Sequence, residues 1–412
     1  MEKTNATTIE MAATNTAEKK KKGAIIGAAF IMATSAVGPG FLTQTAVFTE
    51  RFNSNFAFAI LMVTIATIIV QLNIWRVICV SGMRGQDIAN KVLPGLGYFV
   101  AFLVALGGLA FNIGNIGGAA LGLNVLFGMN TTVGVLLAGG LGAFVFLQKD
   151  MGNIMDRLTK VLGAMMIIVM TYVAISSNPP VGQALHDAVL PESYGALSFS
   201  IITLLGGTIG GYITFAGAHR LVDADTKGIE NLDKINQSSI LGVSVASIIR
   251  IMLFLAVLGV VSTGFKLDPS NPPASAFRAG AGIVGYKIFG LVIFSAALTS
   301  IVGAAYTSVS FLKTLSKTVM ENENKFIIGF IAFSTVVMAF IGKPVVLLIL
   351  AGSLNGLILP LTLAIVLLGS RKEEIVGKYK HSKLLTALGW VVVVASGYAG
   401  MLSLQNIMKI FN

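Results

Sequence analysis

Long apolar stretches, each long enough to cross a membrane, alternate with short polar segments along the whole chain. A helix of about 20 apolar residues crosses the roughly 30 Å hydrocarbon core of a bilayer. The pattern therefore predicts an all-α polytopic membrane protein with eleven transmembrane helices. These stretches lie at about residues 24–49, 55–75, 96–128, 131–148, 158–176, 197–219, 238–262, 282–312, 325–342, 344–369 and 384–405.

Two of the apolar stretches are interrupted by glycine-rich segments that also carry polar side chains. The first reads GPGFLTQT (38–45) and the second reads GGTIGGY (206–212). Because glycine destabilises a helix by about 1 kcal/mol and lipid leaves freed backbone groups without partners, such breaks persist where they line a cavity. Breaks at matching places in two halves predict inverted repeats of five helices with a midplane site. For Gly206, Gly207 and Gly217, close helix packing is an equal alternative.

The expected organisation follows from these repeats. A polar, disordered cytoplasmic tail covers 1–22, a first five-helix repeat covers 23–180, a second covers 181–370, and an eleventh helix with the C-terminus covers 371–412. The prolines of the connection at 176–196 predict a turn-rich cap without a helix.

Composition and charge agree with a membrane protein. The 412 residues are 55% hydrophobic and 11% charged, whereas soluble domains carry about 25% charged residues. Of the 29 lysines and arginines, 22 fall on one side of the predicted spans, five on the other and two within them. This asymmetry predicts a cytoplasmic N-terminus and an outside C-terminus in the inner or plasma membrane of the cell. The single cysteine, Cys79, excludes a disulfide framework and a multi-cysteine metal site.

Four segments resemble the NRAMP family of divalent-metal transporters, and the similarity extends through most of the chain. They are GPGFL (38–42), RVICVSGMRGQDIA (76–89), GGAALGLNVLFGM (117–129) and MDRLTKVLGAMM (155–166). The resemblance implies a LeuT-type fold, in which two inverted repeats of five helices have broken helices 1 and 6.

The chain departs from that family at the metal site. The family uses Asp-Pro-Gly-Asn in helix one and Met-Pro-His in helix six. Counting from GPGFL places the first motif at 49–52, and counting from GGT places the second at 210–212, where Tyr212 occupies the histidine position. The acidic residue of helix three falls at Asn115. Since divalent ions need carboxylate or soft ligands, these changes predict a divergent branch without a metal site. Transport of Mn²⁺ or Mg²⁺ through an altered site is the alternative.

The expected substrate is a small carboxylate-bearing organic solute. The second half of each broken helix begins at its break and directs backbone amides and the positive end of its dipole into the site. NRAMP-related proteins without metal motifs accompany enzymes of 5-oxoproline (pyroglutamate) breakdown, which makes 5-oxoproline the specific expectation. Asn112 and Asn355 either complete the lining or join helices. The expected substrate-binding residues are Gly40, Thr43, Gln44, Thr45, Asn115, Thr208, Gly210, Gly211, Tyr212 and Thr214.

The sequence gives fewer indications of the coupling ion and of the roles of the remaining polar residues. Thr299 and Ser300 resemble the hydroxyl pair that holds sodium in the wider fold, so the coupling ion is expected to be Na⁺ or H⁺, without a further cofactor. For Arg250, the sequence is compatible with a structural role and with a substrate-binding role. His219 is expected in a solvated loop. Metalloprotease, P-loop and nucleophile motifs are missing from the sequence, which argues against an enzyme. The expected partners are a small-molecule substrate and the bilayer, without nucleic acid. The oligomeric state stays open and is compatible with a monomer.

Overall fold

The computed structural model describes residues 36–148, 164–165, 167–313 and 316–411. Helices make up the regular secondary structure of these residues. The longer ones are α2 Pro39–Phe52, α3 Phe56–Ser81, α5 Leu96–Phe127, α6 Thr131–Leu147, α9 Ser198–Ile209, α10 Ile213–Asp223, α11 Leu232–Ser262, α12 Pro272–Lys313, α14 Glu323–Ile341, α15 Pro344–Gly369 and α17 Lys383–Phe411. The shorter ones are η1 Asn53–Asn55, α4 Gly85–Val92, α8 Val181–Asp187, η2 Ile229–Asn231, α13 Lys317–Glu321 and α16 Glu373–Val376.

Eight helical segments in the described part of the chain are long and apolar enough to cross a membrane. Two shorter apolar helices, Thr131–Leu147 and Ile167–Ser176, accompany them. The observed ends of α5 and α15 lie within one residue of the predicted stretches. The all-helical membrane fold is confirmed. The number of eleven spans stays a prediction, because the first part of the first stretch and part of the fifth lie outside the described residues.

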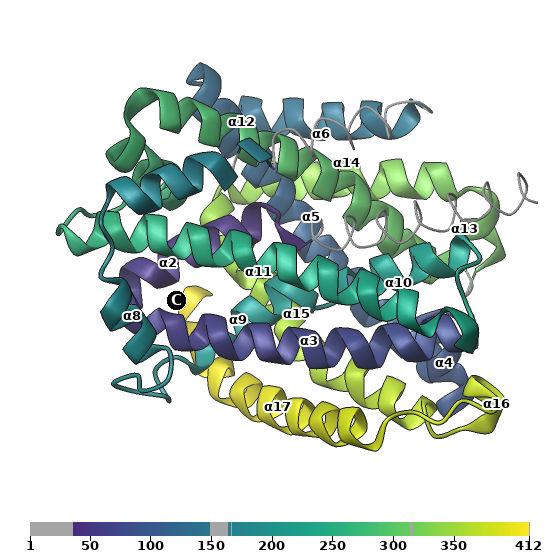
Figure 1. Cartoon of the computed structure of the whole chain (residues 1–412). Coiled ribbons are helices and arrows are strands. Elements are labelled where there is room, and N and C mark those ends of the chain that lie inside the picture. The colour runs from purple at the N-terminus through teal and green to yellow at the C-terminus, as the bar shows by residue number, and fades with distance from the viewer. Residues whose placement is uncertain (1–35, 149–163, 166, 314–315, 412) are drawn as a thin grey trace, which may run out of the picture.

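Helix α2 lies in the middle of the bundle, as Figure 1 shows. It packs against α5, α9, α11, α12 and α15, and ten of its 14 residues are buried. Small residues permit close approach between the helices around it. A methyl group at Gly206 of α9 would overlap the backbone of α15 at Gly352. This contact supports the packing interpretation of Gly206.

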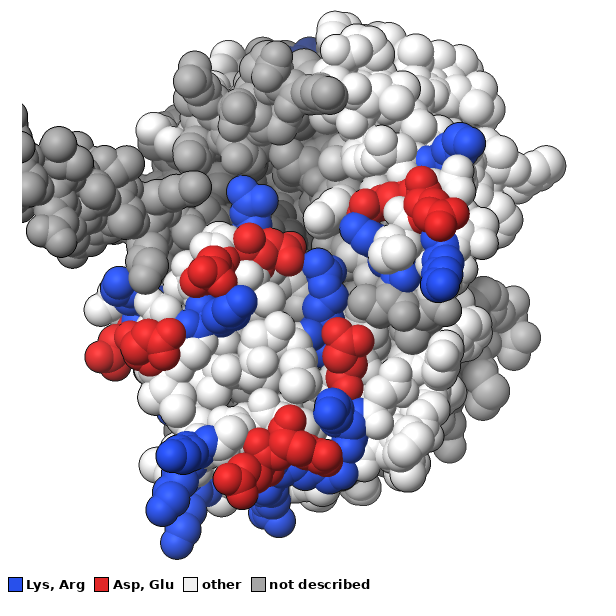
Figure 2. Space-filling model, turned by 90° about the vertical axis from the view of Figure 1, so that its right-hand side faces the viewer, with Lys and Arg blue, Asp and Glu red and all other residues white. Residues whose placement is uncertain are grey.

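Charged side chains gather at one end of the bundle. Helices α4, α13 and α16 lie at one end, whereas α8 and the C-terminus lie at the other (Figure 1). Viewed from the first end, lysine, arginine, aspartate and glutamate side chains surround the helix ends (Figure 2). We call it the charged end and define it by residues 82–95, 223–231, 316–325 and 370–383.

The connection before α9 differs from its prediction. It contains helix α8, Val181–Asp187, where the prolines predicted only turns. Pro180 is the N-cap residue of this helix, so neither Pro179 nor Pro180 removes a hydrogen bond from the helix interior. The prolines thus precede the helix instead of excluding it.

Candidate functional site

Two breaks in the helices define the centre of the bundle. The helix-one break is Val37–Gly38, directly before α2 begins at Pro39, a residue type that favours the first helical turn. The helix-six break is Gly210–Tyr212, between the end of α9 at Ile209 and the start of α10 at Ile213. Gly211 has φ +53°, a left-handed conformation that favours glycine. The interruption of helix six is therefore confirmed where the sequence predicted it.

Four polar side chains join the two breaks, and we call them the break cluster: Asn115, Tyr212, Ser300 and Asn355. A methyl group at Gly38 would lie 3.0 Å from Oγ of Ser300 and 3.7 Å from Oδ1 of Asn115. The side chain of Asn115 in turn lies beside that of Tyr212.

Asn355 completes the break cluster from α15. Its Nδ2 atom donates to the backbone oxygens of Gly107 and Ala351, at 2.9 and 2.8 Å. Its Oδ1 atom lies where a side chain at Gly211 would be. Asn355 thus connects α5 with the helix-six break. The two roles predicted for it, joining helices and lining the site, are compatible.

Several buried polar atoms around the breaks have no hydrogen-bond partner among the described residues. Most buried polar atoms in proteins are hydrogen-bonded, and leaving one unpaired costs about 1–3 kcal/mol. Their concentration here indicates a place where a polar ligand would find partners. The atoms are Thr43 Oγ1, Gln44 Oε1, Asn115 Nδ2, Arg250 Nε, Arg250 Nη2, Ser300 Oγ and Asn355 Oδ1.

Arg250 of α11 brings a positive charge to this region and is only 3% exposed. Its Nη1 atom donates to Oγ1 of Thr208 at 2.7 Å, just before the helix-six break. Its guanidinium lies 4.0 Å from the ring centroid of Phe41, in the first turn of α2. Sequence reasoning left its role open and omitted it from the site. The available signal was its position in the middle of an apolar stretch, where a charge is costly.

The other predicted residues lie close by but point to different partners. Gln44 donates through Nε2 to the oxygen of Leu348 at 2.9 Å. The Oγ1 atoms of Thr45 and Thr299 donate to carbonyl oxygens one turn earlier in their own helices. Thr214 donates to Oε1 of Gln71 on α3 at 3.2 Å. The hydroxyls of Thr45, Thr214 and Thr299 are therefore hydrogen-bonded to groups outside the break cluster.

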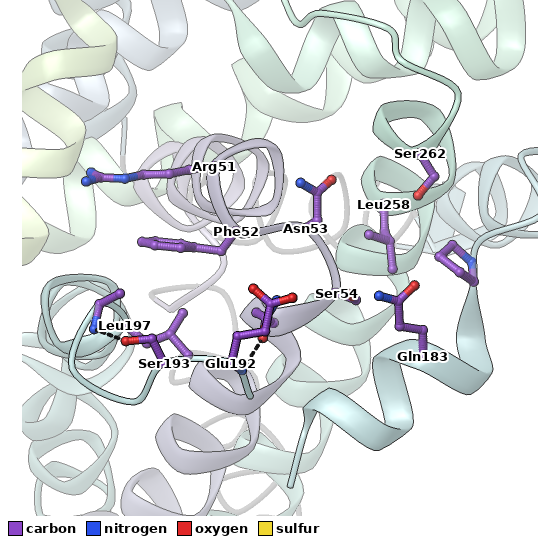
Figure 3. Close-up of a pocket in the computed structure, with 13 residues that line it drawn as sticks. Arg51, Phe52, Asn53, Ser54, Gln183, Glu192, Ser193, Leu197, Leu258 and Ser262 are labelled. Atoms are coloured by element: carbon purple, nitrogen blue, oxygen red, sulfur yellow. Dashed lines mark hydrogen bonds between the residues drawn. The ribbon is translucent and has the colours of Figure 1, made fainter. Parts of the chain in front are cut away.

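A cavity of about 650 Å³ lies at the other end of α2, opposite the charged end (Figure 3). Polar side chains of α2, α8 and α11 and of the segment before α9 line it, among them Arg51, Gln183, Glu192 and Ser262. Helix α2 has 14 residues, about 21 Å of helix, and leads from this cavity to the helix-one break.

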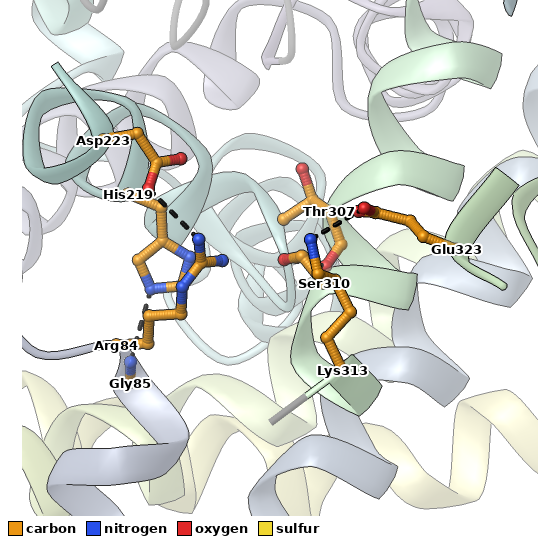
Figure 4. A network of polar contacts seen from close by, with 8 residues as sticks. All are labelled: Arg84, Gly85, His219, Asp223, Thr307, Ser310, Lys313 and Glu323. Atoms are coloured by element: carbon orange, nitrogen blue, oxygen red, sulfur yellow. Dashed lines mark hydrogen bonds and ion pairs between the residues drawn. The ribbon is translucent and has the colours of Figure 1, made fainter. Parts of the chain in front are cut away.

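Polar contacts bridge the helices at the charged end (Figure 4). Arg84 forms an ion pair with Asp223 at 3.1 Å, and Lys313 forms one with Glu323 at 2.7 Å. His219 accepts a hydrogen bond from the backbone N–H of Gly85 at 3.3 Å. Because His219 is only 5% exposed, the expectation of a solvated histidine is wrong.

The comparison with known proteins decides the family. The model of the family described as natural resistance-associated macrophage protein-like (Nramp) matches residues 29–406. The chain belongs to the NRAMP family. It is similar to the uncharacterized membrane protein YcsG of Bacillus subtilis (strain 168), with 54% identity over 93% of this chain and 96% of that one. An uncharacterized membrane protein of Haemophilus influenzae is 50% identical over 91% of this chain and 94% of that one.

Solved transporter structures share the fold at low identity. A manganese transporter of Eremococcus coleocola superposes with a TM-score of 0.74 at 16% identity, covering 94% of this chain and 87% of that one. MhsT in complex with L-phenylalanine gives a TM-score of 0.61 at 14% identity, over 94% and 97% of the two chains. Mhp1 with bromovinylhydantoin gives 0.60 at 17% identity, over 93% and 92%. This member of the NRAMP family is thus a membrane transporter with a LeuT-type fold.

The helix-one break does not coincide with the segment that a count along the sequence assigned to the family's metal motif. Counting along the sequence placed Asp-Pro-Gly-Asn at 49–52, which is the last turn of α2. The break lies at Val37–Gly38, where Gly38–Phe41 read Gly-Pro-Gly-Phe and share Pro-Gly with that motif. Neither the side chain of Gly38 nor that of Phe41 can bind a metal ion.

Proposed function

We propose that this transporter carries a small carboxylate-bearing organic solute, with 5-oxoproline as the specific substrate. The supporting observation is the buried guanidinium of Arg250 beside both breaks. Its Nη1 atom is engaged by Thr208, whereas Nε and Nη2 have no partner among the described residues. These two donors form one edge of the guanidinium, which matches the two oxygens of a carboxylate.

Charge favours an anion over a divalent cation at this place. Two unit charges 4 Å apart interact by about 4 kcal/mol at an effective dielectric constant near 20, and a divalent ion would double the repulsion. A carboxylate instead neutralises the arginine and supplies the acceptor that its edge needs. The described residues also contain no group of three or more His, Cys, Asp or Glu side chains placed to hold a metal ion.

The side-chain amides of the site support a substrate that contains a lactam ring. Within the described part of the chain, the Nδ2 atom of Asn115 is a donor without a partner, and the Oδ1 atom of Asn355 and the Oε1 atom of Gln44 are acceptors without partners. 5-Oxoproline presents a lactam carbonyl and N–H to such groups, together with its carboxylate. Mhp1 binds a hydantoin, another five-membered ring with amide groups, and MhsT binds an amino acid. Both solutes are bound on the fold that this chain shares.

Alternating access would expose the breaks to one side at a time. The cavity at the far end of α2 provides an outer approach, and the Arg84–Asp223 pair bridges the charged end. The charge asymmetry supports the inner or plasma membrane, with the charged end in the cytoplasm. Na⁺ is the proposed coupling ion, held in part by Ser300, whose hydroxyl faces Gly38. H⁺ is the alternative coupling ion.

The test is uptake by the purified full-length protein in liposomes. Radiolabelled 5-oxoproline and Mn²⁺ are supplied in parallel, each with a sodium gradient, a proton gradient or neither. Saturable 5-oxoproline uptake without Mn²⁺ flux is the expected result, and its gradient dependence identifies the coupling ion. Saturable Mn²⁺ flux without solute uptake would establish the alternative function, a divalent-metal transporter with an altered site.

A further inference from the structure

A second polar pocket, of about 530 Å³, lies at the charged end and is separate from the breaks. It is formed by the residues after α15, the segment before α17 and the first turns of α17. Three cationic residues, Arg371, Lys380 and Lys383, line it, and its lining includes no acidic residue. The pocket therefore presents a concentrated positive charge.

The three cations are free to bind an anion. None of their side chains forms a hydrogen bond or ion pair with another described residue. The neighbouring Lys372 differs, since it donates to the backbone oxygen of Lys91 at 2.8 Å and lies 3.5 Å from Glu374. Of the two acidic side chains of α16, that of Glu374 is thus directed to Lys372, and neither lines the pocket.

One wall of the pocket is held in place by a chain of hydrogen bonds. The hydroxyl of Tyr379 lies 3.2 Å from Nδ1 of His381, and Nε2 of His381 lies 2.8 Å from Oδ1 of Asn73 on α3. Asn73 also donates to the backbone oxygen of Leu385 at 3.0 Å. Burial and the nearby Arg76 lower the pKa of His381 to about 4, so the ring is neutral near pH 7. The wall is preorganised, and the charge comes from the three cations.

The pocket lies where a membrane-spanning helix begins. Lys383 is the first residue of α17, and Trp390 lines the pocket seven residues later, about 10 Å along the helix. Tryptophan prefers the boundary between headgroups and hydrocarbon. Leu384, Val391 and Val394 on α17 are 63–69% exposed, which suits contact with lipid chains. The pocket thus combines cations at headgroup level with an apolar helix face leading into the bilayer.

We propose that this pocket binds the phosphate of an anionic phospholipid headgroup, with the acyl chains along α17. Basic pockets between transmembrane helices are suited to such headgroups. The same phosphate chemistry would suit soluble inorganic phosphate, but the pocket's position beside Trp390 and the exposed apolar face favours the lipid.

Native mass spectrometry of the full-length protein in detergent tests this proposal. Phosphatidylglycerol, phosphatidylcholine and inorganic phosphate are added separately and in competition. The pocket variant is Arg371→Gln/Lys380→Gln/Lys383→Gln, and the matched variant is Lys234→Gln/Lys317→Gln/Lys325→Gln, which removes the same charge elsewhere. We expect phosphatidylglycerol to bind at least tenfold more tightly than phosphatidylcholine. Its affinity should fall about fivefold for each pocket cation removed and less than about twofold in the matched variant.

Three results would overturn the proposal. Equal losses in both variants would mean diffuse attraction without a site. Equal binding of the two lipids would show that the headgroup charge is not recognised. Displacement of phosphatidylglycerol by equimolar inorganic phosphate would assign the pocket to a soluble anion. Melting temperatures of both variants, measured in the same detergent, ensure that folded proteins are compared.

Discussion

Arg250 and Thr208 are joined by a hydrogen bond of 2.7 Å, two residues before the helix-six break. The hydroxyl of Thr208 donates its own proton to the oxygen of Leu204 at 2.6 Å, so its oxygen accepts from Arg250. This pair orients the guanidinium while leaving its Nε and Nη2 donors unengaged within the described residues. The relationship gives a costly buried charge a fixed orientation, with one edge of the guanidinium unengaged, as the proposed carboxylate binding requires.

Replacing Arg250 by lysine should raise the KM for 5-oxoproline about 10- to 100-fold. Lysine keeps the charge but lacks the bidentate edge, and a hydrogen bond to a charged group contributes about 1.5–3 kcal/mol. Uptake kinetics in liposomes measure this change. Arg278→Lys serves as the matched control, because Arg278 is exposed at the side of α12. An unchanged KM in Arg250→Lys would contradict the proposed role.

Replacing Arg250 by methionine should abolish uptake without destabilising the substrate-free protein. An apolar residue of similar length removes a buried charge whose Nε and Nη2 atoms lack partners among the described residues, and such replacements are often neutral or stabilising. A melting temperature equal to or above that of the wild-type protein is expected in detergent. A clear fall in melting temperature would show that Arg250 acts mainly through packing.

The hydroxyl of Tyr212 should contribute to solute binding more than to folding. Tyr212→Phe keeps the edge-to-face contact with Phe111, whose ring centroid is 5.9 Å away, and removes only the hydroxyl, which lies beside Asn115. We expect a two- to tenfold rise in KM, the effect of about 0.5–1.5 kcal/mol. Tyr306→Phe, at an exposed position of α12, is the control. Tyr212→Ala and Gln44→Ala should both lose solute binding, and retained affinity in both would count against the site.

Gly211→Ala should impair both stability and transport. Alanine is strained at φ +53°, and its methyl group would collide with Oδ1 of Asn355. The strain costs about 1–3 kcal/mol, which a fall in melting temperature would record. Gly303→Ala is the control, because Gly303 lies within α12 with open space around it. Equal melting temperatures for the two variants would show that the helix-six break is less constrained than the contacts indicate.

The Arg84–Asp223 pair should restrict access from the charged end. Its side chains are 25% and 41% exposed, so Arg84→Gln should change stability by less than about 1 kcal/mol. Labelling of a Ser310→Cys reporter in a Cys79→Ala background should become faster, since Ser310 is buried at the same end of the bundle, next to the Lys313–Glu323 pair (Figure 4). Lys227→Gln, which removes a more exposed ion pair with Asp225, should leave the labelling rate unchanged. Equal rates in both variants would exclude a gating role for Arg84.

His381 should make stability depend on pH in a defined direction. Its pKa is lowered from 6.5 to about 4, first by burial and then by Arg76. Between these values the unfolded chain binds a proton that the folded protein does not, so this contribution is complete above pH 6.5 and is lost toward pH 4. The melting temperature of His381→Gln should therefore fall less steeply than that of the wild-type protein over this range. Measurements above pH 7 are the internal control, and parallel pH profiles would contradict the prediction.

Hydropathy alone determined the class of the protein and most helix ends. The ends of α5 and α15 follow from where apolar residues stop, because the bilayer imposes a local requirement on each helix. The helix-six break was also predictable, since Gly210 and Gly211 weaken the helix within their own segment. The charge asymmetry could also be obtained from the sequence, because it does not depend on contacts between distant residues.

Only the tertiary structure decided which residues meet at the breaks. The helix-one break lies at Val37–Gly38 and not at 49–52, where a count along the sequence had placed the metal motif, because such a count cannot locate a break. The partners of Arg250 and the burial of His219 depend on Thr208, Phe41 and Gly85, which come from other helices. Packing across the bundle sets these contacts. A charge or an imidazole therefore acquires its role from neighbours that are far away in sequence.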